Sequence, residues 1–331
     1  TITVPAEQVH ALRLQMAARI RAHNAQQPKA QRLLVAYDDL NVFLDELHER
    51  SGERDPVASL ETMRLVDHID AILATAVPTV VDAVLGGTQG DESLDLPRDA
   101  RRIARRMNRS LRREALLLQA IYDRPQQAPG RTARLRRYLG LARPRKRAMW
   151  GALAALGWLV PAGAGAAWWY FGAWEQKPLW WGIVGGAALV WVALLFKRLV
   201  VDGWVLRRRA RRIARRLRVL SRQPASLAIS LAQIDPATLG GPLSPLSEGD
   251  ESRYAMLARL REFLTPLGCT GMVILVDRVD EPTLVRGDPR AMRALIWPLL
   301  SNKFLQQEGG GVKLLLPIEL RHALFQESSA F

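Results

Sequence analysis

Three acidic residues close a short apolar run near the C-terminal end of the chain. Asp277, Asp280 and Glu281 follow Met272–Val276, a run that suits a strand buried on both faces. Acids gathered at one strand end need a cation among them, and Mg²⁺ with a nucleoside triphosphate meets that need. On this hypothesis Asp277 is the metal ligand, and Asp280 or Glu281 polarises the attacking water. The alternative is a surface loop whose acids merely follow a buried strand.

The residues around these acids indicate a strand–helix–strand unit. One helix is expected to end near Gly268, and another to begin after Asp288 as N-cap, with Pro289 at its first position. Val312–Leu316 is the next strand candidate. Such a unit predicts two parallel strands joined by a right-handed crossover. Ligands of parallel sheets bind at the carboxyl ends of the strands, where the acids lie.

The run Val273–Glu281 resembles the Walker B region of signalling-type P-loop NTPases, the NACHT and KAP groups of the STAND class. NACHT members typically carry a small residue after the first Asp, whereas this chain has Arg278. KAP members carry membrane helices ahead of this strand, in the order found here. The resemblance implies Mg²⁺ and ATP as cofactors and a sensor strand ending near Leu316. It also implies that Arg321 is the residue that senses the phosphates.

The phosphate-binding loop of that class is missing from the sequence. No G-x-x-x-x-G-K-[ST] occurs, and no Gly is followed by Lys. Two explanations compete. The chain is part of a longer protein whose phosphate loop lies elsewhere, which we favour because two strands are too few for a stable sheet. Otherwise the site is degenerate and the domain is a scaffold.

Two uncharged segments predict a transmembrane helical hairpin over residues 148–196. Ala148–Trp174 has 27 residues without a charge and Pro178–Phe196 has 19, and a span needs roughly 20. Only three residues separate them. Nine of the 10 Trp residues fall between Trp150 and Trp204, which is typical of interfacial belts. Two buried helices of a soluble domain are the weaker alternative.

Basic residues gather on both flanks of the hairpin. Arg131–Arg147 holds 8 Lys or Arg and Arg207–Arg218 holds 8 Arg, out of 47 in the chain against 32 acids. The positive-inside rule then places the turn outside and both termini in the cytoplasm, as in a two-pass inner-membrane protein. The expected partner of these arginines is anionic lipid headgroups. A nucleic-acid partner is disfavoured because the rest of the chain is close to charge balance.

Small residues in the hairpin suggest association between membrane helices. Gly182 and Gly186 form a G-x-x-x-G pattern, which lets helix backbones approach closely. The pattern favours a homo-oligomer or a membrane complex. Gly is also common in membrane helices generally, and that reading stays equally open.

The first 128 residues are expected to form a helical cytosolic arm. Leu33, Tyr37, Leu40, Leu44 and Leu47 recur at three- and four-residue steps, as on one helix face. The run from residue 33 to residue 39 also resembles a strand ending in two acids, but the helical period continues through it and we interpret it as helix. Cys269 is interpreted as a small core residue.

The sequence therefore predicts a mostly α-helical membrane protein with a partial parallel α/β, P-loop NTPase-like segment at its C-terminal end. The expected divisions are a helical arm (1–128), a basic juxtamembrane segment (129–147), the hairpin (148–196), a basic stalk (197–222), a linker (223–250) and the α/β segment (251–331). The expected function is a membrane-anchored signalling-type ATPase whose nucleotide state controls oligomeric assembly. The alternative is a non-enzymatic membrane scaffold or pore subunit.

Overall fold

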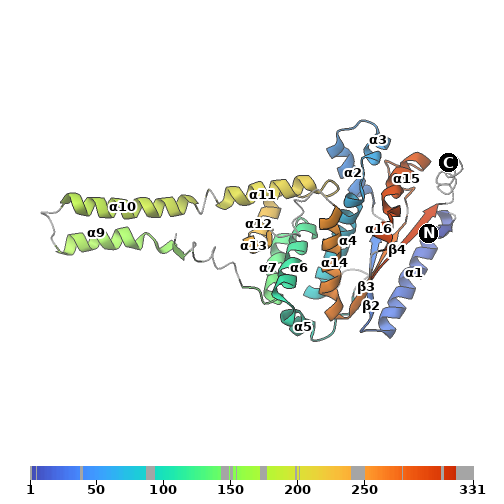
Figure 1. Cartoon of the computed structure of the whole chain (residues 1–331), viewed down its shortest axis with the longest axis horizontal. Helices are drawn as coiled ribbons and strands as arrows, with labels where there is room; N and C mark the ends of the chain where they lie inside the picture. The colour runs from blue at the N-terminus through green and yellow to red at the C-terminus, as the bar shows by residue number, and fades with distance from the viewer. Residues whose placement is uncertain are drawn as a thin grey trace.

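The structure, a computed structural model, shows a mixed α/β body from which a pair of helices projects (Figure 1). It describes residues 2–4, 6–37, 40–86, 94–142, 149, 152–153, 155–171, 177–197, 200, 202–239, 250–277, 279–306 and 309–317. Most of these residues are helical. The predicted class, mostly helical with a small parallel sheet, is confirmed at this level.

The sheet has four parallel strands in the order β1-β4-β3-β2. The strands are β1 (Ile2–Val4), β2 (Gln31–Tyr37), β3 (Cys269–Val276) and β4 (Gly310–Pro317). The first two come from the start of the chain and the last two from its end. The N-terminal arm and the C-terminal segment therefore build one sheet together.

Successive side chains of the strands point to opposite faces of the sheet, and each face packs into its own hydrophobic core. One face, which includes Leu33, Val35 and Ile274, packs under most of the helices. The other face, which includes Leu34 and Val273, is covered by α1 (Ala6–Gln26). Burial on both faces explains why the strands are nearly continuous apolar runs instead of alternating ones.

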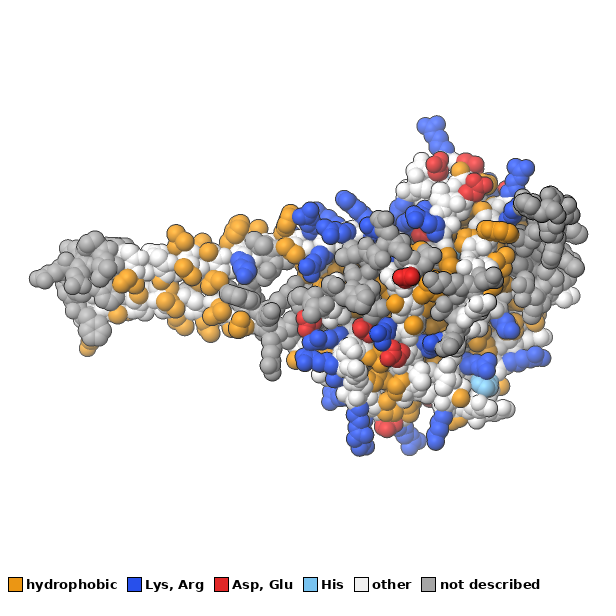
Figure 2. All heavy atoms as spheres, viewed as in Figure 1, with side chains coloured by type: hydrophobic (Ala, Val, Ile, Leu, Met, Phe, Trp, Pro, Cys, Tyr) orange, Lys and Arg blue, Asp and Glu red, His pale blue; other side chains and the backbone are white. Residues whose placement is uncertain are grey.

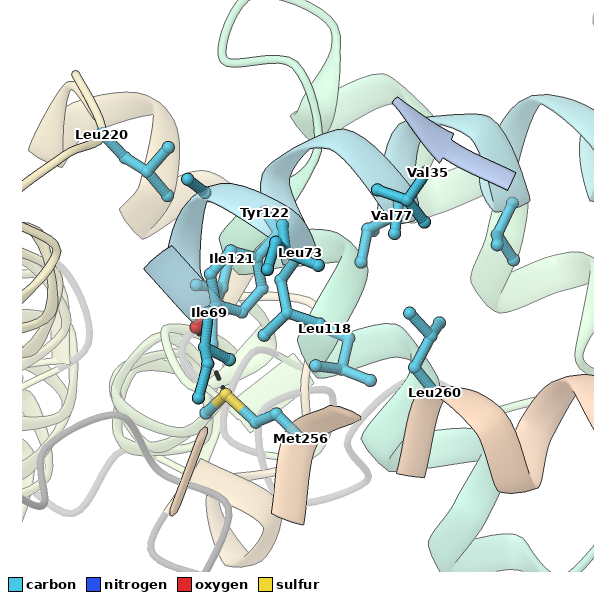
Figure 3. Packing of buried hydrophobic residues seen from close by; sticks show 14 of the residues in the cluster. Val35, Ile69, Leu73, Val77, Leu118, Ile121, Tyr122, Leu220, Met256 and Leu260 are labelled. Carbon is cyan, nitrogen blue, oxygen red and sulfur yellow. Dashed lines mark hydrogen bonds between the residues drawn. The ribbon is translucent and has the colours of Figure 1, made fainter. Parts of the chain in front are cut away.

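The larger core is built around α4 (Leu65–Leu85), α6 (Arg109–Tyr122) and α14 (Asp250–Leu264). Figure 3 shows apolar side chains of these three helices packed against one another, among them Ile69 and Leu73 of α4, Leu118 and Ile121 of α6, and Leu260 of α14. Burying such a side chain contributes about 1.5–3 kcal/mol. This core holds the helices that surround the sheet.

The strand–helix–strand unit near the C-terminal end is confirmed. Helix α15 (Pro289–Ile296) joins β3 to β4, which pair in parallel. Asp288 is its N-cap, and its side chain accepts a hydrogen bond from the Arg290 amide at 3.0 Å. Before β3, α14 ends in a short 3₁₀ turn at Gly268, whose φ of 91° favours glycine. Cys269 is buried at the start of β3, and burial raises the pKa of its thiol.

The expectation of an all-helical arm is wrong at β2. Residues 31–37 form a strand, and α2 (Leu40–Ser51) begins only at Leu40. A spacing of four, as between Leu33 and Tyr37, keeps side chains on one face of a strand as well as of a helix. The apolar residues of β2 and of α2 therefore face the same core. Their spacing alone cannot show where the strand ends and the helix begins.

Several other short helices complete the body. They are α3 (Pro56–Glu61), α5 (Ala100–Arg106), α7 (Ala128–Tyr138), α12 (Pro224–Leu231), α13 (Pro236–Leu239) and α16 (Asn302–Leu305). Helix α12 buries Leu227 and Leu231, so the interpretation of 223–250 as a linker is wrong for its first part.

The projecting pair consists of α9 (Leu159–Phe171) and α10 (Lys177–Phe196), which lie side by side and away from the body (Figure 1). Two helices therefore pack together within the predicted segment, and the transmembrane hairpin itself stays a prediction. Among the described residues, the helix long and apolar enough to cross a membrane is α4, and most of it is buried in the body. The apolar helical stretch Gly182–Phe196 in α10 is shorter than a span, as are the 13 residues of α9.

The basic flanks of the hairpin are partly structural. Helix α11 (Asp202–Arg216) follows the hairpin, with Leu206 and Ile213 buried against the body and most of its arginines exposed. In α7, by contrast, Arg131 is buried and pairs with Asp82 at 2.6 Å and Asp123 at 2.9 Å. This part of α7 therefore packs into the body, and the juxtamembrane assignment of residues 129–147 stays a prediction.

Candidate functional site

Asp277 lies immediately after β3, an inner strand of the sheet, and its side chain is buried. Its carboxylate faces Arg13 of α1, with 3.7 Å between Asp277 Oδ2 and Arg13 Nε. Because Val276 packs into the larger core, the next residue points to the opposite face, where α1 lies. Strand pleating therefore aims the carboxylate at α1.

The site lies where a parallel sheet is expected to bind ligands. Helix α1, after β1, covers one face, whereas α2 and α15, after β2 and β3, bury their apolar residues in the core on the other. Ligands of open parallel sheets bind outside the carboxyl ends of the strands. Asp277 and Arg13 lie at this edge.

The loop after β3 separates the other two predicted acids from Asp277. Val279 and Val285 are buried and fix the loop to the body. Asp280 is half-buried, and its carbonyl accepts a hydrogen bond from the Gly287 amide at 3.1 Å. Glu281 is exposed. The structure thus orders the loop and leaves the Glu281 side chain at the surface.

The fit of this site to Mg²⁺ depends on one buried carboxylate. No group of three or more His, Cys, Asp or Glu that could hold a metal occurs in the described parts of the chain. Mg²⁺ commonly takes one or two protein carboxylates and fills its remaining positions with water and phosphate. Asp277 can supply one such ligand, and the neighbouring Arg13 can supply positive charge to a phosphate.

Other expected features fall elsewhere. Arg321 and Arg278 lie outside the described residues. A single residue separates β1 from α1, so the corner that precedes Arg13 holds no Gly-rich loop. Arg13 itself was missed, because nothing in its spacing links it to Asp277.

A second polar cluster, which sequence reasoning missed, is buried among α4, α6 and α14 and reaches Tyr37 at the end of β2. Asp70 of α4 accepts hydrogen bonds from the Tyr122 hydroxyl at 2.6 Å and from Arg253 at 3.2 and 3.3 Å. Nearby, the Tyr37 hydroxyl lies 3.0 Å from His68 Nδ1. Burial raises the pKa of Asp70 to about 6 and lowers the pKa of His68 to about 3. The only sequence signal was polar residues inside an otherwise apolar helix.

No family model, curated protein or solved structure matches this chain. Function is therefore inferred from the arrangement at the carboxyl edge and from the paired helices α9 and α10.

Proposed function

We propose that this protein is a membrane-anchored ATPase of the signalling P-loop type, whose nucleotide state controls oligomeric assembly. The observation that carries the proposal is the buried carboxylate of Asp277 at the end of an inner parallel strand, beside the Arg13 guanidinium. Burying a carboxylate costs free energy unless a nearby positive charge compensates it.

The proposal assigns a role to each predicted residue. Asp277 would hold Mg²⁺, which would supply charge stabilisation for phosphoryl transfer to water. Asp280 or Glu281 would polarise that water, and the exposed position of Glu281 leaves it accessible to a bound nucleotide. Arg321 would sense the phosphates. The phosphates would be bound by groups other than a Gly-rich corner between β1 and α1.

The hairpin supplies the proposed anchor. Its described surface is apolar, with exposed side chains such as Leu159, Tyr170, Leu189 and Phe196, and Figure 2 shows hydrophobic side chains along it. An apolar surface of this extent suits lipid better than water. The described apolar stretch of α10, Gly182–Phe196, is shorter than a span, so crossing a hydrocarbon core of about 30 Å would take all 20 residues of the helix at 1.5 Å per residue. The proposal places both termini in the cytoplasm.

ATP hydrolysis by the full-length protein in detergent tests the enzymatic part. Asp277→Asn should lower turnover at least about a hundredfold because it removes the charge that would hold Mg²⁺, and one of Asp280→Asn and Glu281→Gln should do the same because it removes the group that polarises the water. Asp288→Asn, which keeps a capping side chain on α15, serves as the control and should retain activity. A wild type that neither binds nor hydrolyses ATP would refute the enzymatic proposal.

Anionic headgroups are the proposed partner of the arginine face of α11. Basic side chains gather where the hairpin meets the body (Figure 2), and Trp204 lies exposed with Arg208 5.2 Å from its ring. Each basic residue near an anionic surface contributes about 1 kcal/mol. Replacing both Arg211 and Arg212 with Gln should therefore weaken binding of phosphatidylglycerol in mixed micelles roughly thirtyfold.

The chain contains its own control for this experiment. Residues 101–106 repeat the sequence of residues 211–216, and the arginines at 101 and 102 are exposed on α5, away from the hairpin. The corresponding double change at Arg101 and Arg102 should leave lipid binding unchanged. Equal losses from the two pairs would mean that α11 is not the lipid contact.

The second candidate function is a non-enzymatic scaffold that oligomerises through the hairpin. Gly157 packs against Trp191 inside the hairpin, whereas added side chains at Gly182 and Gly186 would meet only open space. The G-x-x-x-G face is thus left available to another helix. Oligomerisation that Gly182→Leu and Gly186→Leu abolish, in a protein without ATPase activity, would favour the scaffold.

A further inference from the structure

Helix α2 connects the loop after β3 to the end of α11. It begins three residues after β2 ends and spans 12 residues, about 18 Å at 1.5 Å per residue. Leu40, Leu44 and Leu47 are buried along one side, which fixes the helix against the core. Each end of α2 makes hydrogen bonds to another element.

At the first end, Asn41 binds the loop that follows the acidic strand. Its Oδ1 accepts a hydrogen bond from the Thr283 amide at 2.9 Å and lies 3.4 Å from the Thr283 hydroxyl. Thr283 is two residues beyond Glu281. Asn41 is thus a positioning residue for the loop that carries Asp280 and Glu281.

At the other end, Arg50 binds the C-terminal end of α11. Its guanidinium donates to the carbonyl oxygens of Ala214 at 2.8 Å, Leu217 at 2.9 Å and Leu220 at 3.0 Å. Glu46, one turn earlier on α2, holds the guanidinium with 2.5 Å between Oε1 and Nε. The carbonyls at a helix end have no partner in their own helix, so the planar fork of Arg50 satisfies groups that would otherwise need water.

We propose that α2 couples the loop after β3 to the C-terminal end of α11, the helix that follows the hairpin. A ligand that moves this loop would pull on Asn41, and the rigid helix would pass the displacement to the end of α11 through Arg50. Linkage makes the effect reciprocal, so a load on the hairpin would change the loop. That a nucleotide is the ligand which moves the loop rests on the function proposed above. The connection of the loop to α11 through α2 does not.

Hydrogen exchange of the full-length protein in detergent, without nucleotide, tests the connection. Asn41→Ala should speed exchange roughly fivefold in residues 279–288 and also in residues 214–220, at the far end of α2. Arg50→Lys keeps the charge but loses the fork, and should speed exchange in the same two segments. Asn41→Asp keeps the accepting oxygen and should behave as the wild type does.

Asn24→Ala is the matched control. Asn24 binds the backbone of Arg32 through both side-chain atoms, at 2.9 and 2.8 Å, near the start of β2. Its loss should leave residues 214–220 unchanged. Effects of Asn41→Ala confined to 279–288, or faster exchange that extends through α4, would overturn the coupling. The experiment contains no nucleotide, so the coupling through α2 can be observed even if the protein has no ATPase activity.

Discussion

Replacing Asp70 with alanine should lower the free energy of unfolding by about 3–5 kcal/mol at pH 7.5. The reason is Arg253, whose side chain is 3% exposed and pairs with Asp70 at 3.2 Å. Without Asp70, its guanidinium keeps its charge in a site that water does not reach. The Tyr122 hydroxyl also loses its 2.6 Å contact with the carboxylate. Chemical unfolding in detergent, followed by far-ultraviolet circular dichroism, measures the loss.

Two further variants separate the charge effect from simple truncation. The double variant Asp70→Ala, Arg253→Met removes the stranded charge as well, and should recover much of the loss. Glu262→Ala breaks the exposed Arg259–Glu262 pair, whose side chains are 42% and 53% exposed, and should cost less than about 1 kcal/mol. A double variant no more stable than Asp70→Ala alone would contradict this account.

His68 should make the protein sensitive to acid below about pH 6.5. Burial lowers the pKa of its imidazole to about 3 in the folded protein, whereas the pKa of an unfolded histidine is about 6.5. Between these values the unfolded chain binds the extra proton, so stability is present above pH 6.5 and falls as the pH is lowered. The loss should approach about 5 kcal/mol near pH 3. Unfolding curves from pH 7.5 to pH 4 measure its slope.

Neighbouring groups determine how this experiment is read. Burial raises the pKa of Asp70 to about 6, so this carboxyl acts in the opposite sense, and its contribution falls as the pH rises from about 4 to about 6. His68→Gln should flatten the acid loss, and Asp70→Asn should steepen it. His23→Gln, on α1, is the control and should leave the profile intact. An unchanged profile in His68→Gln would refute the assignment.

The sequence was most informative where one local feature determines the structure. Asp288 with Pro289 marked a helix start, and the apolar run before Asp277 marked a strand, because caps and buried runs depend on adjacent residues. At residues 31–37 the same apolar signal was present, followed by Asp38 and Asp39. The spacing there fits a helix as well as a strand, and a single sequence cannot show which other strand would lie alongside.

The candidate site was predictable only in part. Asp277 was identified from its place after a strand, whereas Arg13 and Asn41 approach from distant parts of the chain. The arginines were similarly ambiguous. The two basic runs suggested contacts with lipid, yet Arg218 of the second run donates to the Thr62 carbonyl oxygen at the end of α3. Composition gives the charge of a side chain but not whether its partner is a headgroup or a helix end.

Because distant parts of the chain share one sheet, the sheet also limits when the protein can fold during synthesis. Strand β2 leaves the ribosome early, but its partner β3 follows only after the whole hairpin has been synthesised. Until then its apolar faces lack the neighbour that buries them, and closing so long a loop is slow. An anchored hairpin would hold the two halves of the chain near each other during this wait. The hairpin would thus assist folding before it takes part in any function.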